Sequence, residues 1–191
     1  MKNLFKTEQS GRSMVEMLGV LAIVGVLSVG GIAGYSKAMA KYKTSQTLDQ
    51  ISMLVANIRT TFSSATSYKD LTTEKARDWG IASSDMYGTG SDDLINPFLG
   101  KVEVGPATAN GIANMGFAVM YSGLSRDACV SLATAGWGEG FSGVSDGGDG
   151  SKIPDAIAAP VSGGSIEFGD AADECNPNAD TDTCTLALYF F

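Results

Sequence analysis

The stretch that decides the fold runs from Gly11 to Tyr35 and reads GRSMVEMLGVLAIVGVLSVGGIAGY. It leads into twenty residues without a charged side chain, Met17 to Ser36. A bilayer's hydrocarbon core, about 30 Å thick, needs roughly 20 helical residues. The segment is too long for a signal-peptide core of roughly 7–15 apolar residues. We therefore interpret it as a helix that enters a membrane.

Composition excludes several kinds of protein. The net charge of −8 argues against nucleic acid as a partner, because binding a phosphate backbone needs clustered Lys and Arg. The chain has no histidine, which removes Ser-His-Asp and Cys-His catalysis and His-ligated zinc. Most enzyme interpretations are therefore weakened. We assign no catalytic residues, cofactor or bound metal, and we expect that the chain is not an enzyme.

Glu16 is a charged residue at the start of the apolar segment, and its presence there needs an explanation. A carboxylate there is tolerable near the membrane interface, where it can reach the headgroups. It becomes expensive if the segment packs among apolar neighbours, and it then needs a cationic partner. An ordinary interfacial charge and a paired assembly charge are the two interpretations.

The residues around Glu16 resemble the prepilin processing site of type IV pilins. The resemblance rests on the short basic leader MKNLFKTEQSG, its terminal glycine, and a glutamate five residues further on. It implies that a prepilin peptidase cuts between Gly11 and Arg12 and usually methylates the new terminus. It also implies that Glu16 attracts the amino terminus of a neighbouring subunit and so sets the register of assembly. Arg12 stands where the family generally has an apolar residue, and its i, i+4 spacing also allows a pair with Glu16 inside one helix.

Glycines interrupt the apolar segment at five positions: Gly19, Gly25, Gly30, Gly31 and Gly34. Each costs about 1 kcal/mol relative to alanine in a water-exposed helix. Gly30 and Gly34 form a GxxxG pair, which is typical of closely packed helices. A stretch that unwinds locally during assembly is the other interpretation.

A second apolar pattern follows the membrane segment. Its spacing of three and four residues indicates one face of a helix; the residues are Leu48, Ile51, Val55, Ile58 and Phe62. All five prolines lie at or beyond Pro97, so nothing breaks a helix over residues 12–64. At 1.5 Å per residue such a helix is on the order of 78 Å long, and we expect its N-terminal half to protrude.

The C-terminal two thirds of the chain, residues 65–191, read as an α+β head. We predict helices at 72–79 and 125–135, a turn at Asn96-Pro97, strands at 101–104, 115–121, 165–168 and 185–191, and an exposed glycine-rich loop at 136–152. The spacing of Asp146 and Asp149 in that loop does not match a calcium-binding EF-hand.

The resemblance implies the type IV pilin fold, in which the long helix packs on an antiparallel sheet. It also divides the chain into a leader (1–11), a pilin helix (12–64, with its membrane or filament-core segment at 14–36) and the head.

Three cysteines in a translocated domain permit one disulfide and one free thiol. The motif LSRDACVSL around Cys129, and the place of Cys175 before the last strand, resemble the disulfide cysteines of type IVb pilins. The resemblance therefore implies a Cys129–Cys175 disulfide with Cys184 as the free thiol. A local Cys175–Cys184 bridge across the turn NPNADTDT is the alternative.

Taken together, the resemblance implies a structural subunit of a type IV pilus that forms a surface filament for adhesion, motility, conjugation or DNA uptake. Its implied partners are further copies of the chain, the prepilin peptidase and an assembly platform in the bacterial inner membrane. It implies residence in that membrane before assembly and in an extracellular pilus afterwards. A minor pilin or type II secretion pseudopilin, and a tip adhesin or DNA receptor, are the alternatives.

Overall fold

The computed structural model describes residues 14–88, 93–148, 150, 152–154, 159–160, 166–178 and 181–191. The chain divides into two compact units, of which the first ends at Ala40 and the second runs from Lys41 to Phe191. The expected leader, with Gly11 and Arg12, lies outside the described residues.

Helix α1 is one uninterrupted helix of 48 residues, Met14–Thr61. In the second unit its buried face consists of Thr47, Ile51, Leu54, Val55 and Ile58, and Phe62 is buried just after the helix ends. This confirms the apolar face that the three-and-four spacing predicted, with Leu48 only partly buried.

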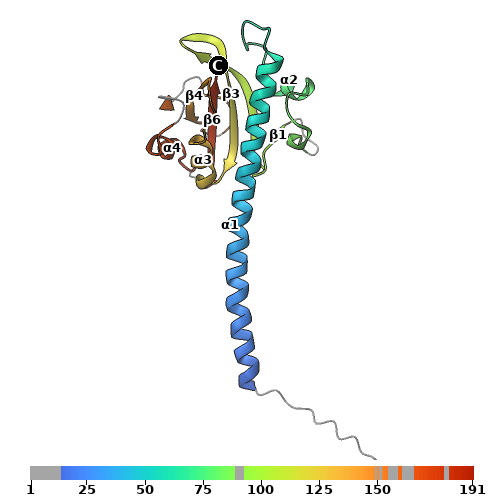
Figure 1. Cartoon of the computed structure of the whole chain (residues 1–191), viewed down its shortest axis with the longest axis vertical. Helices are drawn as coiled ribbons and strands as arrows, with labels where there is room; N and C mark the ends of the chain where they lie inside the picture. Colours follow the sequence, from blue (N-terminus) through green and yellow to red (C-terminus); the bar gives the residue numbers. More distant parts are fainter. Residues whose placement is uncertain are drawn as a thin grey trace, which may run out of the picture. The chain divides into compact units, whose positions relative to one another are not determined.

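The second unit is built on one sheet of six strands in the order β1-β2-β3-β6-β4-β5 (Figure 1). The strands are β1 Leu94–Ile95, β2 Lys101–Ala109, β3 Ile112–Leu124, β4 Phe141–Asp146, β5 Ala159–Pro160 and β6 Cys184–Phe190. Every neighbouring pair is antiparallel. The predicted fold class, a long helix with an antiparallel α+β head, is confirmed.

Strand β6 lies between β3 and β4, and all seven of its residues are buried. Its register pairs Tyr121 with Leu186 on one side and Val144 with Leu188 on the other. An exposed apolar strand invites pairing with other chains, so this central position explains how the ending LALYFF is tolerated. The prediction of a protected C-terminal strand is confirmed.

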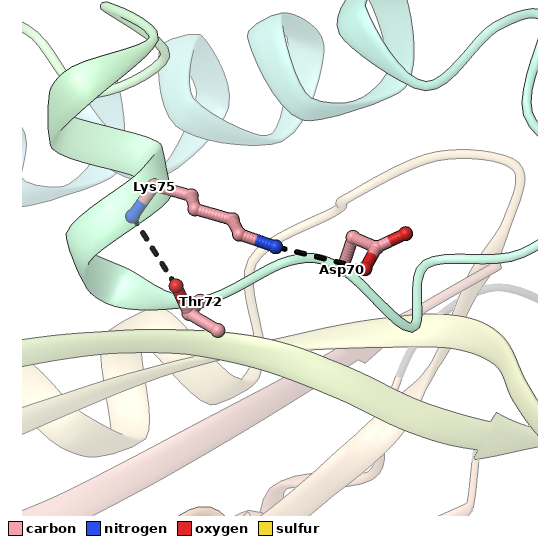
Figure 2. Close-up of polar contacts among 3 residues, drawn as sticks. All are labelled: Asp70, Thr72 and Lys75. Carbon is pink, nitrogen blue, oxygen red and sulfur yellow. Dashed lines mark hydrogen bonds and ion pairs between the residues drawn. The ribbon is translucent and has the colours of Figure 1, made fainter.

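Local capping signals set the short helices. Thr72 precedes α2 (Thr73–Asp78), and its side chain accepts a hydrogen bond of 3.2 Å from the Lys75 backbone N–H. Figure 2 shows this cap together with the ion pair of 3.6 Å between Lys75 and Asp70. Ser125 caps α3 (Arg126–Ala133) in the same way. The helix at 125–135 was predicted from its cap, Ser125, and the helix at 72–79 from its helix-forming residues.

Two predictions for the head are wrong. The expected loop at 136–152 contains β4, because pairing with β6 and β5 turns a glycine-rich segment into a strand. Its Phe141 and Val144 are buried, and the register shifts between Phe141 and Gly143. The expected strand at 165–168 is absent from its described part, since Phe168 opens helix α4 (Phe168–Glu174).

The sheet is apolar on both faces. One face joins α1, α2, α3 and α4 in a large cluster that includes Ile58, Tyr121 and Leu186. The other face holds a smaller cluster of Ala118, Met120, Ala187 and Tyr189, against which Ala107 and Ile153 pack. The alternation of side chains along β3 and β6 places these neighbours on opposite faces.

Candidate functional site

The first unit presents an apolar helical surface. Thirteen large apolar side chains between Met14 and Tyr35 are exposed, from Met17 at 47% to Met14 at 84%. By length and composition this part of α1 can cross a membrane.

Glu16 lies in the first turn of α1, and its side chain is exposed. The possible i−4 partner, Arg12, lies outside the described residues, as does Gly11. A helix N-terminus carries a partial positive charge, so a carboxylate in the first turn is favourable there. Glu16 is therefore placed where a carboxylate suits an isolated helix and where a second positive charge at the helix start would strengthen the interaction.

The glycines of the apolar segment are not used for packing within the part of the chain that is described. A Cβ added at Gly19, Gly25, Gly30, Gly31 or Gly34 would meet no described atom within 4 Å. Their small size is thus available to an approaching helix of another molecule.

The disulfide joins Cys129 on α3 to Cys175, the residue after α4, with Cα atoms 5.8 Å apart. This is the pairing that the resemblance implied, and the alternative Cys175–Cys184 bridge is not formed. The bridge spans 46 positions of sequence, so on the chain-entropy model it stabilises the head by up to about 4 kcal/mol.

Cys184 is the free thiol and lies buried at the start of β6. Its Sγ donates a hydrogen bond of 3.3 Å to the carbonyl oxygen of Cys175. Burial raises the pKa of the Cys184 thiol, and the charges of Asp146 and Asp182 raise it further while Arg126 lowers it. A buried thiol that stays protonated is a poor nucleophile, which protects the neighbouring disulfide from exchange.

Sequence reasoning missed a polar pocket of about 170 Å³ beside α1. Its lining includes Gln50 and Asp85, and Gln50 Nε2 donates a hydrogen bond of 2.9 Å to Asp85 Oδ2. Hydrogen bonds from Ser83 and Gln50 hold the pKa of the Asp85 carboxyl below its usual value. Since 35 positions separate Gln50 from Asp85, no local pattern could have revealed the pair.

The described residues contain no cluster of three or more His, Cys, Asp or Glu side chains that could hold a metal ion. Asp146 therefore belongs to no such cluster. Its Oδ1 accepts a hydrogen bond from the Gly148 backbone N–H. Asp149 lies outside the described residues.

Comparisons with known proteins agree with this architecture. The family described as PilS N terminal matches residues 41–188. The chain is 27% identical over 137 residues to the major structural subunit of bundle-forming pilus from Escherichia coli O127:H6 (strain E2348/69 / EPEC), covering 72% of this chain and 70% of the relative. It is 28% identical over 134 residues to the toxin coregulated pilin of Vibrio cholerae, covering 68% of this chain and 59% of that pilin. This chain belongs to the type IV pilin family.

The fold of the pilin agrees with a solved structure of the family. The crystal structure of TcpA, a type IV pilin from Vibrio cholerae El Tor biotype, matches 78% of this chain and 99% of its own with a TM-score of 0.53 and 19% identity. Members of the family are structural pilins, so the prediction that this pilin is not an enzyme is confirmed.

Proposed function

We propose that this pilin is the repeating structural subunit of a surface filament, held in the inner membrane before assembly and in an extracellular pilus afterwards. The observation that carries the proposal is the exposed apolar helix of the first unit. Each large apolar side chain contributes roughly 1.5–3 kcal/mol on burial, so thirteen of them represent roughly 20 kcal/mol or more. A domain's net stability is only about 5–15 kcal/mol, so this surface must be covered by lipid or by neighbouring subunits.

Processing follows from the same proposal. The prepilin peptidase removes residues 1–11 by cutting between Gly11 and Arg12, and the pilin helix at 12–64 then carries the head at 65–191. The assembly platform of the inner membrane extracts the subunit, and residues 14–36 move from lipid into the filament core. The Cys129–Cys175 disulfide supports a head that folds outside the cytoplasm, where disulfides persist.

Glu16 sets the stagger of the subunits in this proposal. Apolar helices slide past one another at little cost, because apolar contacts are not directional. One carboxylate in an apolar core is stabilised only where a positive charge meets it, so the amino terminus of the neighbouring subunit selects one register. Such a pair contributes specificity more than stability.

Substitution of Glu16 tests the proposal. Glu16→Ala should leave the precursor processed and membrane-inserted, because the helix becomes more apolar, while sheared filaments are lost or sharply reduced. Arg12→Phe with Glu16 kept is the matched control, and it should assemble if the α-amino group is the partner. Normal filaments from Glu16→Ala would contradict the register role.

The mature protein tests the wider proposal. Mass spectrometry should find a chain that starts at Arg12, and this pilin should be the abundant component of purified filaments, as the relative's name describes for the bundle-forming pilus. An unprocessed Met1 would contradict the processing site. Trace amounts in filaments would instead indicate a minor pilin, and such a role at the tip would fit an adhesin or DNA receptor.

A further inference from the structure

Leu99 is an unusual residue in the head. Its side chain is 80% exposed, the highest value among the large apolar residues described in the second unit. It also adopts a φ of 68°, a left-handed conformation that leucine rarely takes because its Cβ crowds the backbone. Strained residues persist only where the surrounding structure imposes them, and they concentrate at functional sites.

The turn between β1 and β2 imposes this conformation. Asn96 is only 3% exposed, and its Oδ1 accepts hydrogen bonds from the backbone N–H groups of Phe98 at 2.8 Å and Gly100 at 3.2 Å. Its Nδ2 donates a third hydrogen bond of 2.8 Å to the carbonyl of Ser122. Gly100 lies so close to Ser122 that an added Cβ would collide with that carbonyl. The turn is therefore a rigid support that displays one leucine to the outside.

A groove of about 430 Å³ lies on the sheet face that α1 does not cover. Its apolar lining consists of Gly105, Pro106, Ala107, Ile153 and Pro154. Gly105 leaves room in it, since a Cβ there would approach Ile153 Cδ1 to 3.2 Å. The groove is large enough for an aliphatic side chain, and these apolar residues offer it a surface beside the polar lining residues Thr108 and Asn114.

Leu99 cannot fill the groove of its own subunit. Leu99 is 80% exposed and is not among the residues that line the groove. From Lys101, where β2 begins, five positions of extended strand lead to Pro106, which is roughly 16 Å at about 3.3 Å per residue. A protruding side chain on one surface and an apolar groove on another are the two halves of a heterologous contact, and repeated heterologous contacts that do not close into a ring build filaments.

Charge favours this contact over others on an anionic molecule. The chain carries a net charge of −8, so most surfaces of two copies repel. Beside Leu99, however, Lys101 pairs with Asp93 at 3.2 Å. The groove is bordered by one acid, Glu103, and one base, Lys152. Both surfaces are therefore locally neutral, and their approach meets little electrostatic repulsion.

We propose that Leu99 of one subunit inserts into the groove formed by Pro106, Ala107 and Ile153 of the next subunit in the filament. This inference rests on the proposed filament function. The strain at Leu99 is offset in the filament, where the side chain is buried, and not in the isolated subunit, where it faces water.

Substitution of Leu99 separates this role from folding. Asparagine tolerates the left-handed conformation, so Leu99→Asn should keep a melting temperature at or above that of the wild type. The yield of sheared filaments should nevertheless fall on the order of tenfold or more, since the leucine's burial is lost. Leu99→Met keeps an apolar side chain and should retain most of the filament yield.

Cross-linking tests the partner surface. Filaments of a Leu99→Cys, Thr108→Cys variant should give a ladder of linked subunits under mild oxidation, because Thr108 borders the groove. The matched pair Leu99→Cys, Trp79→Cys places its second thiol on an exposed residue outside the groove and should give none. A ladder from the control pair but not from the Thr108 pair would overturn the proposal.

The possible failures are distinguishable. Absence of filaments from the wild type would overturn both this inference and the proposed function. Wild-type filaments with an unchanged yield from Leu99→Asn would overturn the Leu99 contact alone. A smaller amount of unassembled Leu99→Asn pilin in the membrane fraction would show that the leucine contacts lipid instead of a second subunit. This outcome would also overturn the proposal.

Discussion

Replacing Asn96 by alanine should destabilise the head strongly, although the residue lies in a turn and takes part in no helix or strand. Its side chain makes three hydrogen bonds, to Phe98, Gly100 and Ser122. A hydrogen bond contributes about 1 kcal/mol net, and more when its loss leaves a buried group unpaired. We expect Asn96→Ala to lower the free energy of unfolding by about 3 kcal/mol. For a unit of this size that corresponds to roughly 10 °C in melting temperature.

Tryptophan fluorescence of the full chain in detergent measures this effect. The chain has two tryptophans, Trp79 and Trp137, and both lie in the second unit, so the membrane helix does not contribute to the signal. Asn176→Ala is the matched control: Asn176 is exposed and makes one hydrogen bond, to Asp173, so the change should cost less than about 0.5 kcal/mol. If Asn96→Ala also stays within that limit, the turn is not held by this side chain and the reasoning is wrong.

Three further predictions use the same unfolding assay. Gly100→Ala should lower stability by about 2 kcal/mol or more, because the new methyl group collides with the Ser122 carbonyl, and a stability equal to wild type would refute the contact. Tyr121→Phe should be neutral or stabilising by up to about 1 kcal/mol, since the buried Tyr121 hydroxyl has no hydrogen-bond partner among the described residues. A clear loss of stability would show that the hydroxyl does have a partner. The pKa of Asp85 is lowered in the folded protein from its usual value of 3.8. The Asp85 carboxylate therefore contributes to the free energy of unfolding above pH 3.8, and this contribution is lost as the pH falls through the folded pKa. Asp85→Asn should therefore lose less stability than wild type on acidification from roughly pH 5 to pH 2, and an equal loss would contradict this.

Periodicity made α1 predictable. The apolar run and the later three-and-four spacing are local patterns, and both appear in the structure as one helix, Met14–Thr61. The cap at Ser125 was predictable for the same reason, since a side chain that bonds the backbone three residues on needs no distant partner. The helix at 72–79 was predicted from its helix-forming residues, and the structure adds the cap at Thr72. The Cys129–Cys175 disulfide was predicted from the resemblance to a family and not from cysteine spacing alone.

The errors fall where distant pairing decides the structure. Strand β4 has glycines on either side and within it, and its strand conformation depends on hydrogen bonds to β6, some forty residues later. The apolar residues Ile166 and Phe168 suggested a strand, but alanines and acids follow Phe168 and form α4, whose end the disulfide ties to α3. Neither the pairing of β4 with β6 nor the disulfide at the end of α4 can be predicted from the neighbouring sequence.

Glu16 and Leu99 show why only one of the two proposed assembly residues was visible before the structure. A carboxylate at the start of an apolar segment breaks a compositional rule, so reading the sequence is enough to find it. A leucine with a φ of 68° breaks a conformational rule, and the sequence NPFLG contains no sign of it. Places where local rules are broken without a local compensation are expected to be functional. The partial positive charge of the helix N-terminus compensates Glu16 only in part, and Leu99 lacks an apolar surface; we propose that neighbouring subunits supply the full positive charge and that surface. The apolar helix would then provide most of the driving force for assembly, while these two residues restrict the arrangements in which the subunits fit.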